Sequence, residues 1–581
     1  YSQDWNDRAQ KEFDGICEKL KSRGDLVFEL PSGQITDLEK KLREERKKGA
    51  QYTAGSLRNQ RYALCSSYIA RHAHILVAFW DGEKKETEGG TCWTILDFAR
   101  GQSLAEYRKH HTGACFEDTL IPDFPLLRRH GLGAIWHIPA PRNQDSQQAG
   151  EPANPTWLDG ELKPDGNDAN TPPSRLGFLD NIDRFNEESA LVPADDRQLS
   201  LQYLSLASPP DLSKGDNSDP TPSPSVPYRH HHSKTNDAGL NLTALSGIFA
   251  SADAMAVDYR DIAFWRFLKL GATLFLAVLA FKSADQLNAH RGVLGAIFVL
   301  LLAIMIFLQW RFARDRKHIR HLEYRVLAEG IRVQIAWAVA GLQSCVCDAY
   351  PFKHLDGASW IWHAMRGLHA GLLPDPARTG HVENINHVRN AWIEDQEKYL
   401  QQKIETFRVR KNPDSRWRPK LEGLAPMLRF FRAARLVMLG LGGLALAYKG
   451  LVDFLPVIAD VLPTLTRPNS HLPATPGWAL FVLGVLPLTI AFILNQGMHV
   501  LALEQELEWY AASHHAYCQA NQALQEMLQP AQDKEQLPDA SSRERVAALI
   551  LALGRAALHE SSVWIDLHKK RDVIKSLKPE T

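Results

Sequence analysis

The sequence predicts an α/β domain at the N-terminus, followed by an all-α region with four transmembrane helices and long cytoplasmic helices. Two observations support this prediction. Short apolar runs alternate with helical patterns over residues 1–142, and four longer apolar runs occur in two pairs further along the chain. A chain of 581 residues is long enough for three or four structural units.

Charge and cysteine content narrow the class of protein. The 67 Lys and Arg residues balance 67 Asp and Glu residues, so the composition gives no electrostatic reason to expect nucleic acid as a partner. Seven cysteines are scattered without CxxC pairs or disulfide-framework spacing, which is typical of a reducing compartment. The first residues contain no basic cluster followed by an apolar run, so we expect no secretory signal.

The first domain alternates strands and helices. Asp25–Leu30 and His74–Trp80 are apolar runs of strand length, and Thr53–Ala73 has the spacing of a helix. A further strand is expected at Gly133–Ile138, after the helical segment CWTILDFAR. This alternation implies parallel strands.

The loop that joins His74–Trp80 to the next helix is the candidate ligand-binding site. In open α/β sheets, ligands bind beyond the carboxyl ends of the strands, and glycines before a helix let backbone N–H groups approach a phosphate. The alternative is a glycine turn that only connects the strand to the helix. The predicted binding residues are Asp81, Gly82, Gly89, Gly90 and Thr91.

Residues 143–236 are rich in Pro, Asp, Asn and Ser, so most of this segment is expected to form a linker or excursion without a core. Residues 177–190 are expected to return to the α/β domain. His230, His231 and His232 lack the spacing of a metal site, and we predict no metal there.

Four apolar runs are long enough to cross a bilayer, for which about 20 helical residues are needed. Arg266 and Lys269 interrupt the first run near one end, where basic side chains can reach the headgroups. Buried globular helices are the alternative for the two weaker runs, but each is joined by a short loop to a stronger one. The predicted spans are 263–281, 292–310, 436–454 and 476–496.

Basic residues set the orientation of the spans. Arg260 and Arg266 lie at the start of the first span, Arg311 and Arg314 follow the second, and Arg429 precedes the third. Because cytoplasmic flanks carry more Lys and Arg than the opposite side, both termini are expected in the cytoplasm.

Long amphipathic helices surround the spans. A helix over 239–262 should lead into the first span, and further helices are expected at 322–342, 387–409, 501–528 and 543–567. The charged residues of the second and third of these helices are interpreted as solvated faces. The predicted domains are 1–142 (α/β), 143–236 (linker), 237–312 (first hairpin with its preceding helix), 313–425 (cytoplasmic helices), 426–498 (second hairpin) and 499–581 (C-terminal cytoplasmic helices).

The strings HILVAFWDG, EGGT, GAIWHIPAPR and DNIDRFN resemble the SLOG superfamily of Rossmann-like domains, which are related to the LOG nucleotide-processing enzymes. The resemblance spans roughly residues 1–190 and implies a nucleotide-derived ligand. SLOG domains begin with a strand and a glycine-containing loop that would precede residue 1, so the domain is expected to be incomplete at its N-terminus. LOG enzymes carry an acidic residue soon after the glycine motif, whereas here Asp97 lies too far along the helix, so we expect no enzyme activity.

The segments YRVLAEGIRVQ, VRNAWIEDQEKY and ALGRAALHESSVWIDLHKKRD are similar to the membrane regions fused to SLOG domains in bacteria, of the two-span SLATT type. This resemblance covers most of residues 240–575 and implies an oligomeric effector of anti-phage defence in the bacterial inner membrane. In such effectors a nucleotide signal opens a pore or ion channel.

We therefore expect a nucleotide-gated membrane effector whose partners are a nucleotide second messenger, the lipid bilayer and further copies of the same chain. No cofactor is expected beyond the nucleotide-derived ligand. The sequence contains no Walker loop, HExxH or GxSxG motif. The main alternative is a membrane-anchored enzyme that cleaves a nucleotide or phosphoribosyl substrate. A transporter is disfavoured because no span carries an acidic residue near the middle of the membrane.

Overall fold

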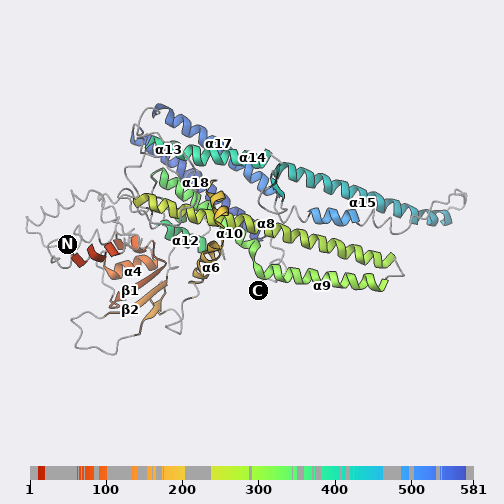
Figure 1. Cartoon of the computed structure of the whole chain (residues 1–581), viewed down its shortest axis with the longest axis horizontal. Coiled ribbons are helices and arrows are strands. Elements are labelled where there is room, and N and C mark those ends of the chain that lie inside the picture. Colours follow the sequence, from red (N-terminus) through yellow and green to blue (C-terminus); the bar gives the residue numbers. More distant parts are fainter. Residues whose placement is uncertain are drawn as a thin grey trace, which may run out of the picture. The chain divides into compact units, whose positions relative to one another are not determined.

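The chain divides into two compact units, each built from several separate segments of sequence. The first unit comprises Tyr1–Ser251, Leu327–Val388 and Pro530–His559, and the second comprises Ala252–Val326, Arg389–Gln529 and Glu560–Thr581. Figure 1 shows the elements. The computed structural model describes residues 11–12, 14–16, 18–19, 62, 65–66, 68–70, 72–83, 90–100, 134–140, 154–159, 161–164, 173, 176–202, 204, 237–286, 291–342, 344–349, 359–369, 372, 381–405, 408–411, 419–422, 424–461, 486–495, 503–531, 537 and 539–570.

A small mixed sheet lies in the first unit, with strand order β1-β2-β3. The parallel pair is β1 (Ile75–Trp80) and β2 (Ala134–Pro139), as the sequence predicts for these two strands. The antiparallel edge strand β3 (Thr156–Leu158) comes from the polar range 143–236, so part of that range belongs to the sheet. The strand predicted at Asp25–Leu30 lies outside the described residues.

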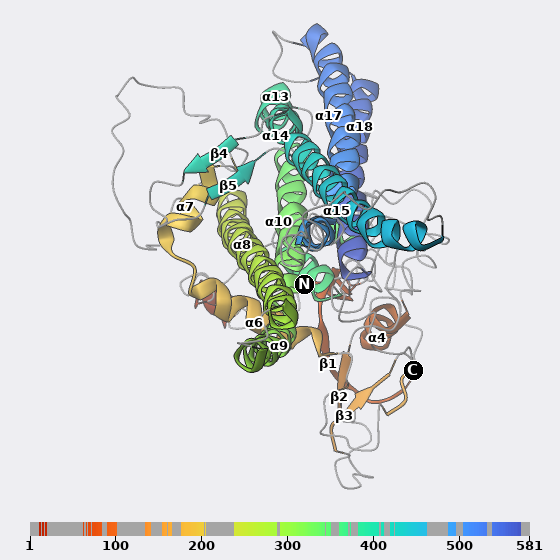
Figure 2. The same ribbon diagram turned by 90° about the vertical axis from the view of Figure 1, so that its right-hand side faces the viewer.

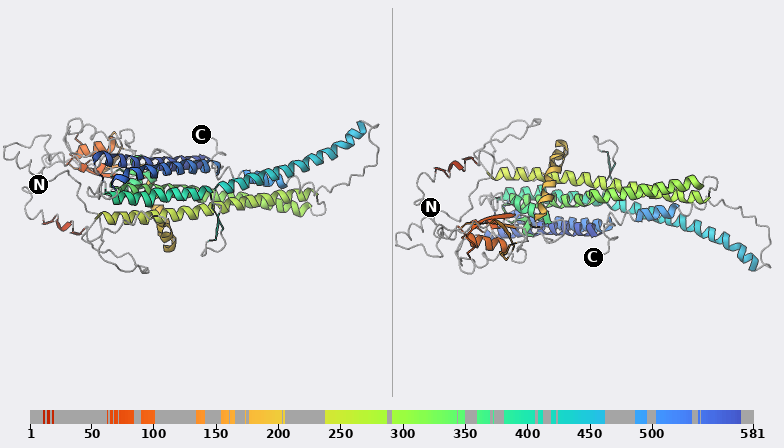
Figure 3. Two further views of the ribbon diagram at one scale, coloured as in Figure 1. Left: turned by 90° about the horizontal axis from the view of Figure 1, so that it is seen from above. Right: turned by 90° about the horizontal axis from the view of Figure 1, so that it is seen from below.

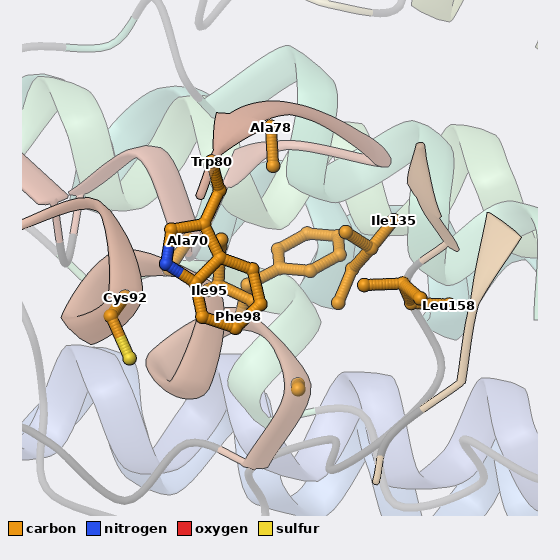
Figure 4. Close-up of a cluster of buried hydrophobic side chains, with 9 residues drawn as sticks. Ala70, Ala78, Trp80, Cys92, Ile95, Phe98, Ile135 and Leu158 are labelled. Carbon is orange, nitrogen blue, oxygen red and sulfur yellow. The ribbon is translucent and has the colours of Figure 1, made fainter. Parts of the chain in front are cut away.

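Helix α4 (Thr91–Arg100) covers one face of this sheet. Side chains alternate along β1, so Ala78 and Trp80 are buried whereas Val77 and Phe79 are exposed. The buried pair packs against Ile95 and Phe98 of α4, together with side chains of β2 and β3 (Figure 4).

Further helices complete the two units. Three helices contribute residues to both: α8 (Asp237–Gln286), α10 (Lys317–Val339) and α18 (Ala540–Lys570). The first unit also contains α6 (Phe178–Ala190), α7 (Ala194–Gln202), α11 (Val346–Ala349), α12 (Ser359–His369) and α13 (Val382–Val388). The ring of Phe178 on α6 stacks on that of His363 on α12, with centroids 3.6 Å apart.

Helix α10 is buried on several sides, which corrects the expectation of a solvated charged face. Arg332 is buried, and the cost of burying its charge is offset by an ion pair with Glu329 at 3.0 Å and by contact with the ring of Phe249. Gln334 is buried because its side-chain oxygen accepts the backbone N–H of Val346 at 2.9 Å. These polar side chains find partners within the protein, and a periodicity argument alone cannot predict such partners.

The predicted helix over 387–409 is interrupted. After α13, a π-helical turn runs over Arg389–Glu394, and α14 (Asp395–Glu405) follows. The wide turn carries Trp392, which is buried edge-on against Tyr517 of α17 (Leu503–Leu528). Figures 1 and 2 show α14 beside α17. Residues 408–409 begin a strand instead of ending a helix, because β4 (Arg408–Lys411) pairs with β5 (Pro419–Glu422).

Among the described residues, four helices are long and apolar enough to cross a membrane: Leu242–Ala284, Gly292–Phe312, Arg429–Tyr448 and Ala540–Ile565. The first lies in α8, the second in α9 (Arg291–Asp315) and the third in α15 (Leu424–Val461), where the sequence predicts spans. The fourth was predicted to be a cytoplasmic helix. Of the predicted span 476–496, only the short apolar helix Leu486–Asn495 lies within the described residues.

Burial separates Ala540–Ile565 from the other three helices. The most apolar window of Gly292–Phe312 has no buried residue, whereas 39% of the window in Ala540–Ile565 is buried inside the protein. Outward-facing apolar side chains on a long helix are typical of lipid contact. Ile550 and Leu558 of α18 are instead packed against protein, and Arg543 and Arg555 add charge to this helix. We therefore interpret α18 as an amphipathic helix that packs one face against the protein.

The second half of α8 and helix α9 form a hairpin within the second unit. Phe281, near the end of α8, has its ring 5.1 Å from that of Phe298, near the start of α9. Arg266, earlier on α8, forms an ion pair with Asp315 at the end of α9. Figures 1 and 3 show the two helices side by side. This arrangement agrees with the antiparallel pair that the sequence predicts.

Candidate functional site

The predicted binding loop joins the carboxyl end of β1 to the first turn of α4. Trp80, the last residue of β1, and Cys92, the second residue of α4, belong to one buried cluster (Figure 4). Because Asp81 and Thr91 directly adjoin these two residues, the structure brings both ends of the loop to one edge of the cluster. Gly89 lies outside the described residues.

The first half of the loop is a turn that Asp81 and Gly82 shape. The Asp81 carboxylate accepts the backbone N–H of Glu83 at 3.1 Å, which is the pattern of an Asx turn. Gly82 has a φ of 83°, in the left-handed region that favours glycine. The Trp80 indole donates to the Glu83 carbonyl at 3.0 Å and holds the turn against the cluster. The Asp81 side chain therefore stabilises the conformation of the loop.

The second half of the loop presents the N-terminus of α4. The Gly90 carbonyl accepts the backbone N–H of Thr94 at 3.0 Å, while Thr91 is exposed at the start of the helix. The first turn of α4 carries no acidic side chain that would offset the positive end of the helix dipole. The first N–H groups of a helix lack partners within the helix, so this end can bind an anion such as a phosphate.

His137 adds a polar side chain beside the loop that sequence reasoning missed. It lies on β2, and its Nε2 atom is 3.1 Å from the Trp80 carbonyl oxygen. The two rings meet edge to face, with centroids 5.6 Å apart. The signal in the sequence was a histidine inside the otherwise apolar strand AIWHIP.

Histidines dock the segment that leads into β1 onto helix α12. The His74 Nε2 atom donates to the His363 carbonyl at 2.7 Å. Nε2 of His72 lies 3.2 Å from Nδ1 of His369, and Arg366 donates to the Ala70 carbonyl. The sheet that carries the candidate loop is thereby attached to the helical core of the first unit.

Among the residues that the structure describes, two side-chain clusters could hold a metal ion, and sequence reasoning missed both. The ligand atoms of Cys345, Cys347 and Asp348 lie within 4.8 Å of one another, and both cysteines are buried. The CxC spacing was the available signal. In the second unit, Glu397, His514 and Cys518 form a half-buried group that satisfies the same distance limit.

The second cluster is satisfied by its own hydrogen bonds. The Cys518 thiol donates to one Glu397 carboxylate oxygen at 3.2 Å, and the Asn521 amide donates to the other at 2.9 Å. Burial and the hydrogen bond to Glu397 raise the pKa of the Cys518 thiol. A protonated thiol is a donor and a poor metal ligand, so this cluster is explained by hydrogen bonding.

The described loop residues thus offer backbone N–H groups and a helix N-terminus at one edge of the sheet, with His137 beside them. Such an edge can bind an anionic ligand. No protein-family model, no curated protein and no solved structure matches this chain.

Proposed function

We propose that the protein is a bacterial membrane effector of anti-phage defence. Its SLOG-like, Rossmann-like domain binds a nucleotide-derived signal at the loop from Asp81 to Thr91. The apolar helices of several copies assemble into a pore that opens on binding and disrupts the inner membrane. The observation that carries this proposal is that α8 is one continuous helix of 50 residues, running from a protein core into a segment suited to lipid.

The two halves of α8 have different surroundings. Leu245 and Phe249 are fully buried among protein side chains. Further along the helix, Asp253 forms an ion pair with Arg325 at 2.8 Å. Beyond this pair, Leu276 and Phe281 are about half exposed, as lipid-facing side chains would be. A helix without proline is stiff, so a shift of its buried half would move its apolar half.

The candidate loop supports the choice of a nucleotide as signal. A helix N-terminus preceded by glycine binds phosphate through backbone N–H groups, and nucleotides carry phosphates. A ligand opens the pore only if it binds the open state more tightly than the closed state. The segment before β1 is hydrogen-bonded to α12, so a conformational change on ligand binding at the loop can be transmitted to the helical core.

Open surface on the membrane helices supports assembly from several copies. A Cβ atom added at Gly440 or Gly443 of α15 would meet nothing within 4 Å. Small residues on an exposed helix face let a second helix approach closely in a bilayer. Four spans from one chain are few to enclose an aqueous path, so several copies are required.

The signal can be tested by native mass spectrometry of the purified full-length protein, looking for a retained nucleotide. We expect Gly90→Trp to lose the retained ligand, because a bulky side chain would block backbone approach at the start of α4. Gly247→Ala is the matched control, since a Cβ there meets nothing within 4 Å. Equal retention by both variants would show that the loop is only a structural turn. Conversion of the nucleotide during incubation would favour the membrane-anchored enzyme.

A further inference from the structure

We propose that Cys345, Cys347 and Asp348 bind a zinc ion in a structural site inside the first unit, with His369, a hydrogen-bond partner of Cys345, as the fourth ligand. This inference is independent of nucleotide binding. It assigns a metal to residues that are more than 250 positions away from the candidate loop in the sequence.

The two thiols are held unusually close. The Sγ atoms of Cys345 and Cys347 lie 3.0 Å apart, nearer than two sulfur atoms in van der Waals contact, and each residue is only 1% exposed. The backbone around them is fixed, because Trp362 donates to the Cys347 carbonyl at 2.8 Å and Gln334 accepts the N–H of Val346 at 2.9 Å. Two buried sulfurs in a fixed arrangement can share a proton or an ion.

Metals bind cysteine as the thiolate, and polar neighbours of a cysteine sulfur favour that form. The Cys345 sulfur has two such neighbours. Sγ of Cys347 lies 3.0 Å away, and the His369 side chain is a hydrogen-bond partner of Cys345. A second thiolate beside the first would then require a cation, because buried like charges are not stable without one.

Hydrogen bonds orient the His369 ring as they do in metal sites. Nδ1 of His72 donates to the Tyr68 carbonyl at 2.9 Å, so Nε2 of a neutral His72 is an acceptor. That Nε2 atom lies 3.2 Å from Nδ1 of His369, which therefore donates. With Nδ1 donating to His72, Nε2 is the His369 atom that can accept the hydrogen bond from the Cys345 thiol. Metal-binding histidines characteristically donate their other N–H to such a partner.

The donor set selects zinc. Two thiolates, one imidazole and one carboxylate match the sulfur, nitrogen and oxygen ligands of tetrahedral zinc sites. The Asp348 carboxylate belongs to the donor set because its Oδ1 atom lies 3.7 Å from the Cys347 sulfur. Two thiolates balance the charge of a divalent ion, and the additional negative charge comes from Asp348, which is only partly buried. The ion would join the loop before α11 to the end of α12, and through His72 to the segment before β1.

The metal content of the full-length protein tests this proposal. Elemental analysis of protein purified with reductant and without chelator should find about one zinc ion per chain. The double variant Cys345→Ser, Cys347→Ser should lose this zinc, whereas Cys65→Ser, which changes an exposed cysteine, should keep it. The difference between the two variants excludes metal bound elsewhere on the chain.

A second measurement keeps the proposal testable if the double variant does not fold. Wild-type protein stripped of zinc and loaded with Co²⁺ should show a thiolate-to-cobalt charge-transfer band. The positioning variant His72→Gln should weaken zinc binding about 10–100-fold without abolishing it. Wild-type protein without zinc and without this band would overturn the proposal. A Cys345–Cys347 disulfide in freshly purified protein, detected by peptide mass spectrometry, would likewise replace the metal site with a redox pair.

Discussion

At the scale of single residues, the Arg266–Asp315 pair explains how a charged side chain is accommodated in the first predicted span. The guanidinium of Arg266 forms an ion pair with Asp315 at the end of α9 and lies 5.0 Å from the centre of the Phe312 ring. An arginine near a membrane boundary is tolerated when its head reaches a partner at the interface. The pair therefore also fixes the end of the hairpin at which Arg266 and Asp315 meet.

Replacing Asp315 with asparagine should lower the thermal stability of the detergent-solubilised protein in a pH-dependent way. The hydrogen bond from Arg266 lowers the pKa of Asp315 in the folded state. Its stabilising effect is therefore complete above the unfolded pKa, about 3.9, and is lost as the pH falls through the lower folded value. Melting temperatures of both proteins across this pH range test the prediction. A difference that stays constant down to the lowest pH would contradict it.

Substitution of Gly554 should be far more damaging than substitution of a glycine in open space. A Cβ at Gly554 would lie 2.5 Å from Nε1 of Trp337, which donates to the Ile550 carbonyl. Overpacking of this kind costs about 1–3 kcal/mol, so Gly554→Ala should melt at a lower temperature than the wild type. Gly247→Ala should gain about 0.5–1 kcal/mol from reduced chain entropy. Equal melting temperatures for the two variants would be inconsistent with the packing of Trp337.

Residue-level chemistry was the hardest part to predict from sequence. The glycines of the candidate loop could be identified because a strand and a helix flank them. The Cys345–Cys347 pair could be read as a CxC motif, but nothing local indicates that His369 lies beside Cys345 or that His72 contacts His369. Contacts across such distances depend on tertiary packing.

At the scale of elements, hydrophobic periodicity and the length of apolar runs predicted the helices that local sequence determines. The extents of α9, α17 and α18 follow the predicted helices closely. The prediction over 387–409 was wrong in part. Trp392 in the π-helical turn packs against Tyr517, which is distant in sequence, and Arg408–Lys411 pairs with the nearby strand Pro419–Glu422 instead of continuing the helix. The antiparallel edge strand β3 was missed because a polar segment of low apolar content can still complete a sheet.

The topology of α18 decides between two arrangements of the C-terminal region. We expect single cysteines at Ser541, in the first turn of α18, and at Ser576, beyond its last residue, to be labelled from the cytoplasm alone. Cysteines at Ser283 and Ser470, in or near the predicted outer loops, should be labelled from the opposite side. Accessibility labelling in oriented vesicles makes this measurement. Labelling of Ser541 and Ser576 from opposite sides would show that α18 crosses the membrane.

At the scale of the whole molecule, exposed apolar side chains gather on the predicted membrane helices. Val299, Ile306 and Leu444 are each more than 60% exposed, on α9 and α15. A soluble surface rarely exposes so much contiguous apolar area, whereas lipid or neighbouring copies would cover it. The membrane assignment therefore rests on both composition and burial.

The continuity of α8 makes a prediction that distinguishes a rigid helix from a flexible tether. Inserting two glycines after Ala254 should uncouple its buried half from its apolar half, because glycine weakens a helix by about 0.8–1.0 kcal/mol per residue. Inserting two alanines at the same point changes the register equally but keeps the helix intact. The glycine variant should lose more of the nucleotide-dependent ion flux than the alanine variant. Both variants should still insert into membranes.

The most direct test of the central claim is ion flux from liposomes that contain the purified full-length protein. The measurement compares flux with and without the nucleotide that native mass spectrometry finds retained. We predict flux that depends on this nucleotide and is lost in the variant with two glycines after Ala254. Bilayers that remain silent while the nucleotide is consumed would contradict the claim and identify a membrane-anchored enzyme.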